Sequence, residues 1–102
     1  MLNQVVLVGR LVDNPEVIKV SEDKKEAIIE IACPRPFKNT EGEYETDYIK
    51  CYLWNAIASN TAEYCSKGDI IGVKGRIQTD ENKNIKLIAE KVTFLNSKKQ
   101  GE

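Results

Sequence analysis

Hydrophobic and polar residues alternate with a period of two towards the end of residues 44–54, which is the pattern of a strand buried on one face. Residues 3–12 are rich in β-branched residues, which also favour a strand. One segment after Trp54 contains alanine, lacks the alternation and fits a helix of about three turns on the 3.6-residue period. Asn55 is available as its N-cap, and Lys67-Gly68 follows as a stop signal. The predicted strands cover residues 3–12, 26–33, 44–54, 70–79 and 85–95, and the predicted helix covers 56–66.

Proline and glycine set the expected limits and bends of these strands. Pro34 and Pro36 are expected to end the second strand, because proline cannot donate a ladder hydrogen bond. Gly9 suggests a bulge or sharp bend in the first strand, and Gly72 and Gly75 permit strong curvature in the fourth.

The order of elements predicts an all-β fold with one short helix. Three strands, a helix and two further strands suit a five-stranded OB-fold barrel, in which closure removes the exposed sheet edges. The length of 102 residues is that of one domain. We expect this domain to span residues 1–96 and to be followed by a short flexible C-terminus, 97–102.

The predicted third strand carries most of the functional information. Its odd positions end in Ile49, Cys51 and Leu53, which suit a core. Its even positions gather aromatic rings around a lysine, and no core requires such a face. Flat rings with a cation among them offer unpaired bases a stacking surface and a phosphate partner. The sequence therefore predicts binding of a single-stranded nucleic acid by the even face, which consists of Tyr44, Thr46, Tyr48, Lys50, Tyr52 and Trp54.

The charge balance restricts how phosphate is bound. A net charge of −1, from 15 basic and 16 acidic residues, argues against bulk attraction to phosphate. The acids Glu41, Glu43, Glu45 and Asp47 lie on the parity opposite the rings, so a locally basic groove remains compatible with this charge. Solubilising a protruding hairpin is an equally compatible role for them. The candidate phosphate contacts are Lys50, Lys38, Arg35, Arg10, Lys74 and Arg76.

Catalysis and metal binding find little support in the composition. The chain has no histidine, which excludes Ser-His and Cys-His pairs, and it has no phosphate-cradling GxxxxGKS loop. Cys33, Cys51 and Cys65 each lie in an apolar pattern and read as small buried hydrophobes. We expect no enzyme activity, no cofactor and no metal. No apolar run is long enough to span a bilayer, and Met1 is not followed by a signal-peptide pattern, so we expect a cytoplasmic protein.

Several motifs follow one another along the chain, at residues 3–11, 14–16, 35–39, 42–44, 47–49, Tyr64, 67–68 and 73–79. In their order and spacing, these motifs resemble those of bacterial single-stranded DNA-binding proteins. The resemblance implies that DNA wraps over aromatic residues, here Phe37, Tyr48 and Trp54, on a homotetramer of OB-folds. It also implies roles in replication, recombination and repair at the nucleoid.

Two departures from the family pattern change these expectations. The hairpin between the last two strands is short and has Asn82 where members often carry another ring, which predicts a lower affinity or a shorter occluded site. The chain ends without the Gly/Gln/Pro-rich linker and acidic tip of typical members, so we do not expect recruitment of replication proteins by that route.

Alternatives remain for the function and for single residues. A dimeric primosome-type accessory protein, or an OB module that binds protein through its ring face, would also fit. Tyr52 could instead lie in a subunit interface, Tyr44 could cover the stem of the hairpin, and Phe37 could pack into the core. Each cationic residue except Lys50, whose parity places it among the rings, has a solvated surface charge as its alternative. Arg76 also has a barrel or interface contact as an alternative.

Overall fold

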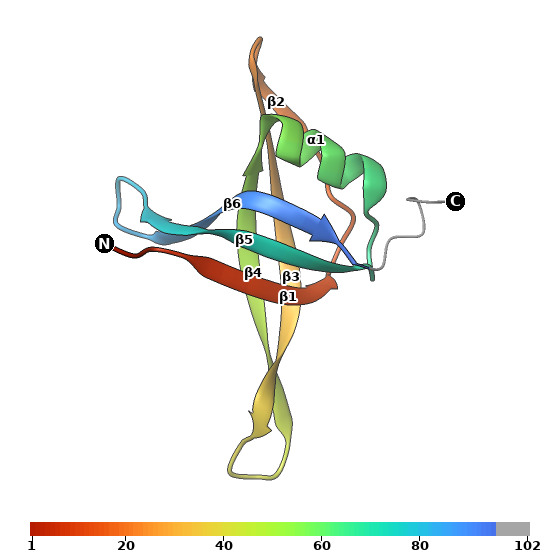
Figure 1. Cartoon of the computed structure of the whole chain (residues 1–102), viewed down its shortest axis with the longest axis vertical. Helices are drawn as coiled ribbons and strands as arrows, with labels where there is room; N and C mark the ends of the chain where they lie inside the picture. The colour runs from red at the N-terminus through yellow and green to blue at the C-terminus, as the bar shows by residue number, and fades with distance from the viewer. Residues whose placement is uncertain (96–102) are drawn as a thin grey trace.

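The computed structural model describes residues 1–95, so the expected C-terminus at 97–102 lies outside the described residues. Its elements run in the order strand, strand, strand, strand, helix, strand, strand (Figure 1). They are β1 (Val5–Leu11), β2 (Ile18–Ser21), β3 (Lys24–Lys38), β4 (Tyr44–Trp54), α1 (Asn55–Tyr64), β5 (Ile70–Thr79) and β6 (Ile85–Phe94).

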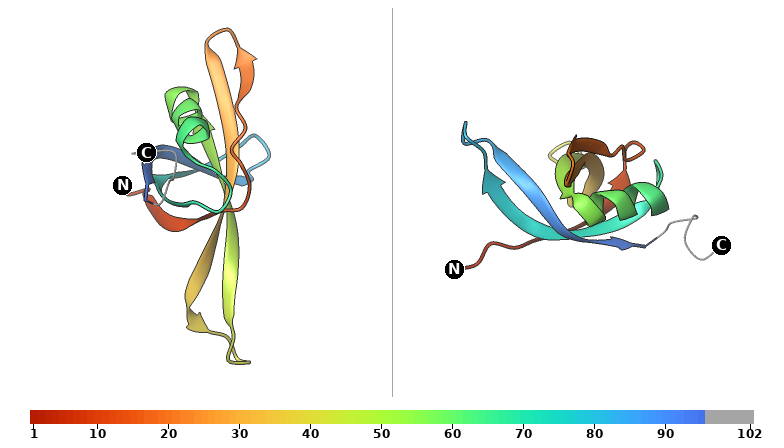
Figure 2. Two further views of the ribbon diagram at one scale, coloured as in Figure 1. Left: turned by 90° about the vertical axis from the view of Figure 1, so that its right-hand side faces the viewer. Right: turned by 90° about the horizontal axis from the view of Figure 1, so that it is seen from above.

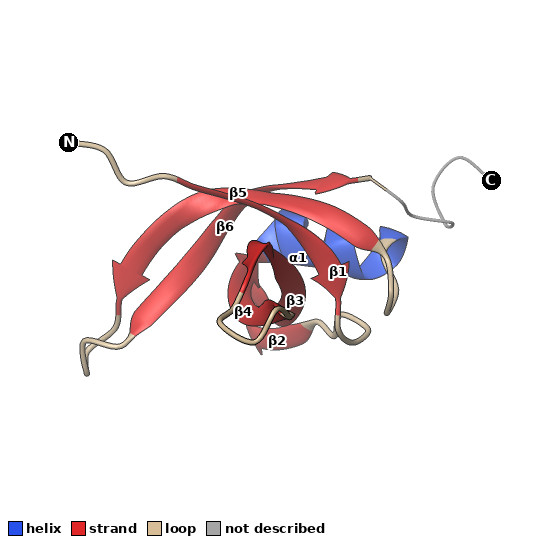
Figure 3. Ribbon diagram, turned by 90° about the horizontal axis from the view of Figure 1, so that it is seen from below, coloured by secondary structure: helices blue, strands red, loops and turns tan. Residues whose placement is uncertain are grey.

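Five of the strands close into a barrel. The sheet order is β1-β5-β6-β4-β3-β2, and β1 also pairs with β3 through Arg10↔Ala32 and Leu11↔Ile31, which joins the two sides (Figure 3). The predicted OB-fold is confirmed. The strand β2 was not predicted. Its sequence, Ile18-Lys19-Val20-Ser21, alternates apolar and polar residues, but four residues are too few for this pattern to stand out, and all four are exposed. It forms a hairpin with the start of β3, and this hairpin projects from the barrel at the end where α1 begins (Figure 1).

The β3–β4 hairpin is longer than expected and projects from the barrel (Figures 1 and 2). The prediction that Pro34 and Pro36 end the strand was wrong, since β3 runs on to Lys38. In the described residues this end of β3 pairs with β4 alone, and the register shifts between Pro34 and Lys38. Proline has no N–H to donate. It is tolerated in this part of β3, because the strand has only one neighbour here and its register with that neighbour is already irregular.

The core follows the predicted odd positions of β4. Cys51 and Leu53 are completely buried, together with Ile31 and Ile71 from neighbouring strands. The helix α1 covers one end of the barrel and buries Ala58 (Figure 1). Burying these side chains provides the main driving force for closing so small a barrel.

The prediction that Asn55 caps the helix was wrong. The N-cap is Trp54, which makes no side-chain capping bond, and Asn55 itself has a φ of 52°. This left-handed conformation is one that asparagine tolerates better than most residues. Its Oδ1 instead accepts a hydrogen bond of 3.0 Å from the Lys25 N–H, which ties the start of α1 to β3.

Gly9 was predicted to mark a bulge or a sharp bend, and the bulge is absent. The register between β1 and β5 is continuous from Val5 to Arg10, so Gly9 forms no bulge. A Cβ at this position would lie 2.7 Å from the Ala32 carbonyl oxygen and 2.9 Å from Cys33 Sγ. Gly9 therefore permits the close approach of β1 and β3 that closes the barrel. The register irregularity lies at Lys74/Gly75 in β5, where strong curvature was expected.

The cysteines are largely buried, as the apolar pattern around them predicted. Cys51 and Cys65 are buried and Cys33 is half-buried. Burial raises the pKa of Cys51 to about 12, so its thiol stays protonated and unreactive at neutral pH. Across residues 1–95, no helix has the length and apolar character needed to cross a membrane.

Candidate nucleic-acid interface

The even positions of β4 form the outer face that the alternation predicted. Tyr48 is 63% exposed and Trp54 is 41% exposed, although the intervening Cys51 and Leu53 are buried. Tyr52 is half-buried on the same strand, and Tyr44 is exposed near the hairpin turn. We call this row of rings, Tyr44, Tyr48, Tyr52 and Trp54, the ring face.

Phe37 belongs to the same end of the protruding hairpin as Tyr44. Its side chain is 60% exposed, so Phe37 is not a core plug. An exposed phenylalanine on a strand with proline on one side and lysine on the other is available for stacking.

Lysine side chains lie over three rings of the ring face. The Nζ atom of Lys24 is 4.1 Å from the Trp54 ring centroid, that of Lys86 is 4.7 Å from Tyr52, and that of Lys38 is 5.8 Å from Tyr44. These distances are those of cation–π contacts. Each contact places a positive charge beside an aromatic ring. The phosphate next to a base stacked on that ring would lie close to this charge.

Sequence reasoning missed Lys24 and Lys86. Both belong to strands that neighbour β4, so only knowledge of strand pairing brings them to the ring face. The sequence alone gives little indication that these two lysines reach the rings. Lys24 is the first residue of β3, and Lys86 is one of several lysines near the β5–β6 turn.

The predicted phosphate contacts fall into two groups. The three arginines already have partners within the protein. Arg10 Nη1 donates to the Gly68 carbonyl at 2.7 Å. Arg76 donates to Glu90 at 3.2 Å and to Gln78 at 2.9 Å. Arg35 pairs with acids of β4.

The lysines of the candidate set differ in position. Lys50 is exposed on the ring face between Tyr48 and Tyr52, as its parity predicted. Lys74 lies on the outside of β5 and lines a hollow with Val6 and Leu95, away from the ring face. Lys50 is thus better placed than Lys74 for a strand that crosses β4.

The acids of β4 are turned to the other side of the hairpin, where Arg35 binds them. Its Nη2 lies 2.9 Å from Asp47 Oδ1, its Nε donates to Oδ2 at 3.0 Å, and its Nη1 lies 3.4 Å from Glu45. The hydrogen bond from Arg35 is the main reason that the pKa of Asp47 is below its ordinary value. This pairing neutralises part of the negative charge close to the rings.

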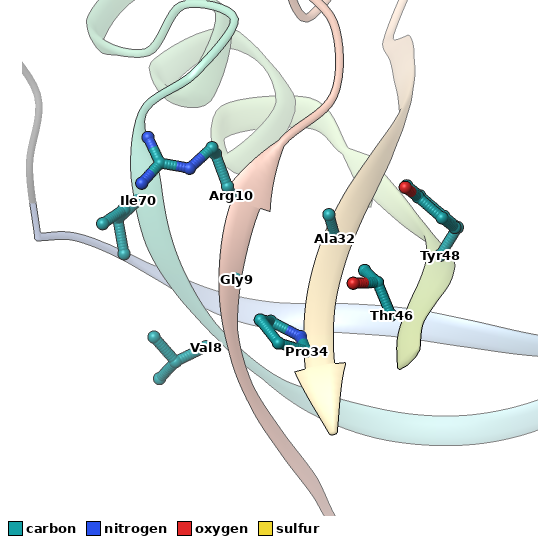
Figure 4. A pocket seen from close by; sticks show the side chains of 8 residues that line it. All are labelled: Val8, Gly9, Arg10, Ala32, Pro34, Thr46, Tyr48 and Ile70. Carbon is teal, nitrogen blue, oxygen red and sulfur yellow. The ribbon is translucent and has the colours of Figure 1, made fainter. Parts of the chain in front are cut away.

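Two clefts flank Tyr48. One lies between β1 and the β3–β4 hairpin and has a volume of about 360 Å³ (Figure 4). In this view the Arg10 guanidinium lies on the side of the cleft far from Tyr48. The other cleft, of about 290 Å³, lies between β4 and the β5–β6 hairpin. Its lining consists of Tyr48, Ile49, Lys50, Tyr52, Ile77, Ile85 and Leu87.

No metal-binding cluster of three or more His, Cys, Asp or Glu residues occurs in the part of the chain that the structure describes. The chemistry of the ring face is that of π-surfaces and ammonium groups, which bind bases and phosphates without making or breaking bonds.

A closed five-stranded barrel with a helix between β4 and β5 and an aromatic outer face on β4 is an OB-fold domain of the nucleic-acid-binding kind. The family model of the single-strand binding protein family matches residues 2–95, and the chain belongs to this family.

Named relatives agree with this family assignment, and a solved structure agrees with the fold. The chain is 43% identical to single-stranded DNA-binding protein B of Bacillus subtilis, over 96% of this chain and 94% of that protein. It is 41% identical to single-stranded DNA-binding protein 3 of Listeria innocua, over 99% of this chain and 68% of that protein. The fold resembles the crystal structure of the wild-type single-stranded DNA binding protein from Thermus aquaticus, with a TM-score of 0.78 and 24% identity, over 93% of this chain and half of that one.

Proposed function

We propose that this protein binds single-stranded DNA without sequence preference and protects it during replication, recombination and repair. The observation that carries the proposal is the ring face, where Tyr48 and Trp54 stay exposed beside buried neighbours on the same strand. The names of the relatives in Bacillus subtilis and Listeria innocua support it. We propose binding as the whole activity, with no catalytic step.

In the proposed complex, bases stack on the exposed rings and lysines follow the backbone. Each stacked base contributes about 1–3 kcal/mol, and stacking tolerates any base because every base has a π-face. The stacking residues are Tyr48, Trp54, Phe37, Tyr52 and Tyr44, with the first three carrying most of the affinity.

The phosphate contacts in this proposal come from lysines rather than arginines. Lys50 and Lys38 remain from the sequence prediction, and Lys24 and Lys86 join them because they lie over rings. Arg10, Arg35 and Arg76 hold parts of the protein together, and Lys74 lies on another face, so we leave these four out.

We further propose that the protein assembles with copies of itself in the cytoplasm, as a homotetramer. In the described residues, Val5 to Gly9 of β1 have a strand partner only in β5, so one edge of this segment is free. Val6 and Val8 are 66% and 56% exposed there. Pairing of this edge with β1 of a second copy would cover both valines.

Sedimentation equilibrium tests this assembly. A mass of four chains is expected, and Val6→Glu is expected to lower the mass because it places a charge in the paired edge. A mass of two chains would favour the dimeric accessory-type alternative, and a monomer would contradict assembly.

Anisotropy of a labelled oligo-dT tests the binding itself. Tyr48→Phe keeps the ring and is expected to bind as the natural protein does, whereas Tyr48→Leu keeps an apolar side chain without a π-face and is expected to bind about tenfold or more weakly. Equal affinities for Tyr48→Leu and Tyr48→Phe would show that Tyr48 does not stack. Absence of any binding would favour a protein ligand for the ring face.

A further inference from the structure

The segment before β1 presents apolar side chains to solvent. Leu2 is 98% exposed, and Met1 is exposed as well. Asn3 holds this segment on β5, because its Nδ2 donates to the Ile77 carbonyl at 2.7 Å and its Oδ1 accepts from the Ile77 N–H at 2.8 Å. The segment therefore continues the line of β1 and carries Leu2 away from its own barrel core. An apolar side chain held in this way suits a contact with another molecule.

The cleft between β1 and the β3–β4 hairpin is mainly apolar and larger than one side chain (Figure 4). Its volume is about 360 Å³. A cavity of about 150 Å³ already accommodates benzene, so this cleft has room for a large aliphatic side chain. Arg10 also lines it, but its guanidinium donates to the Gly68 carbonyl at 2.7 Å and lies far from Tyr48. The apolar part of the lining includes Val8, Ala32, Pro34 and Ile70.

Pairing of two copies along the free edge of β1 determines where Leu2 lies. A two-fold axis brings the same edge of each copy together, so the two strands run antiparallel. The segment before β1 of one copy then runs alongside the end of β1 of the other copy, toward Arg10. There Ala32 of β3 already pairs with Arg10, so the segment cannot continue the ladder. It has to leave the edge where β1 and the β3–β4 hairpin diverge.

The alternation of side chains carries Leu2 to the outer face of the barrel. Val6 and Val8 are exposed on this face, and Leu2 has the same parity along the strand. Side chains directly opposite each other in an antiparallel pair point to the same face. The cleft opens on this face as well, with Val8 and Tyr48 in its lining. Leu2 of a second copy therefore meets the cleft with its side chain.

We propose that Leu2 of one copy docks in this cleft of a second copy. The inference rests on the proposed assembly and goes beyond it, since it assigns a residue of one copy to a site on the other. Because the interface is two-fold symmetric, each pair of copies makes this contact twice. A ladder of a few residues is small beside the roughly 800 Å² that each partner buries in a standard interface. Leu2, together with Val6 and Val8, supplies further apolar area.

The docked side chain completes the surroundings of Tyr48. The Tyr48 side chain is 63% exposed and lines both this cleft and the cleft beside Lys50. Leu2 of the second copy covers the ring on the side of β1 and leaves the side of Lys50 open to DNA. Assembly thereby restricts the movement of a ring that is proposed to stack on a base.

Photochemical crosslinking from inside the cleft tests the docking. Thr46 lines the cleft and is exposed, so p-benzoylphenylalanine in its place contacts the occupant. Isotopically heavy copies without the photoreactive residue are mixed in, and mass spectrometry identifies the linked peptide. We expect links to residues 1–4 of heavy copies, because Asn3 holds the chain's own segment on β5. The matched control carries the photoreactive residue in place of Glu63, which is exposed on α1, and is expected to give no such link.

A parallel sample contains labelled oligo-dT, whose anisotropy reports on DNA binding separately. Links from position 46 to DNA in place of residues 1–4 would overturn the docking and leave the proposed function intact. Links to neither, in copies that assemble, would overturn the docking too. Absence of oligo-dT binding would overturn the proposed function, whereas links to residues 1–4 of heavy copies would still support the docking.

Substitution of Leu2 gives a second test, read by sedimentation equilibrium. Leu2→Asp is expected to raise the dissociation constant of the assembly about tenfold or more, because each pair of copies buries two of these side chains. Leu2→Met keeps an apolar side chain of similar size and is expected to assemble as the natural protein does. Both variants are expected to fold, since Leu2 is 98% exposed within one copy. Equal assembly of the two variants would contradict the docking.

Discussion

At the scale of single residues, the rings and the lysines of this protein work as pairs. Lys24 lies over Trp54, Lys86 over Tyr52 and Lys38 over Tyr44, so three rings of the ring face have an ammonium group close by. A base that stacks on one of these rings must share or replace the contact with the lysine. The lysine then remains within reach of the adjacent phosphate, which suits a surface that binds both parts of a nucleotide.

Trp54→Ala separates binding from stability. Trp54 is 41% exposed at the end of β4, so its removal is expected to weaken oligo-dT binding by about tenfold or more, from a lost stack of about 1–3 kcal/mol. Its effect on the midpoint of urea unfolding is expected to be small. A large loss of stability with unchanged affinity would place Trp54 in the core and refute its assigned role.

The pairing of Asp47 with Arg35 is expected to make the stability of the folded protein depend on pH. Its pKa in the folded protein is below the ordinary value of 3.8, chiefly because Arg35 donates a hydrogen bond to it. The unfolded chain therefore binds a proton at Asp47 more readily, so this contribution is complete above about pH 3.8 and disappears as the pH falls through the lower folded-state pKa. Asp47→Asn is expected to make the acid limb of the stability profile shallower, measured by urea unfolding at a series of pH values. An unchanged acid limb would show that the Arg35–Asp47 pair does not contribute to folding.

At the scale of secondary structure, the two faces of β4 were predictable, whereas β2 and the far end of β3 were not. The period of two placed Ile49, Cys51 and Leu53 inward and the rings outward, because burial on one face imposes that period. β2 escaped prediction because its alternation extends over only four residues, too few to distinguish a strand from a loop. The continuation of β3 through Pro34 also escaped it, because tolerance of proline depends on which edge is unpaired, and only the folded sheet determines that.

The candidate site was predictable to a similar extent. Tyr48, Lys50 and Trp54 follow from one strand and its parity. Lys24, Lys86 and Ile85 come to the same surface only through the pairing of β4 with β3 and β6. Strand pairing over long sequence separations leaves no local signal in the residues themselves.

Gly9→Ala tests how the barrel closes. A methyl group here would lie 2.7 Å from the Ala32 carbonyl oxygen, and the backbone would have to move apart. We expect a loss of about 1–3 kcal/mol in the free energy of unfolding, measured with urea. Gly72→Ala is the matched control, because its nearest neighbour would lie at 3.8 Å, an ordinary contact, and it is expected to cost less. Equal effects of the two substitutions would show that β1 and β3 do not approach as closely as described.

At the scale of the whole molecule, a net charge of −1 coexists with a surface for a polyanion. The two coexist because acidic and basic side chains lie on different faces of the hairpin. The acids of β4 pair with Arg35, and lysines lie over the rings. Affinity that rests on stacking depends less on salt than affinity that rests on many phosphate contacts. The protein is therefore expected to retain much of its DNA affinity at high salt.

Lys86→Met measures one of these phosphate contacts. The logarithm of affinity against the logarithm of salt concentration is expected to become shallower by about 0.7, the value for one neutralised phosphate on a single strand. Lys74→Met, on the outside of β5, is the control and is expected to leave the slope unchanged. A larger change for Lys74→Met than for Lys86→Met would place the DNA on the other face of the barrel.

Fluorescence titration of the natural protein with oligo-dT tests the central claim most directly. Trp54 is the only tryptophan and lies on the ring face, so its emission reports on that surface alone. We predict strong, saturable quenching at low salt that persists at high salt, because a base stacks on the indole. Unchanged Trp54 emission at saturating oligo-dT in low salt would contradict the account, since DNA would then bind elsewhere or not at all.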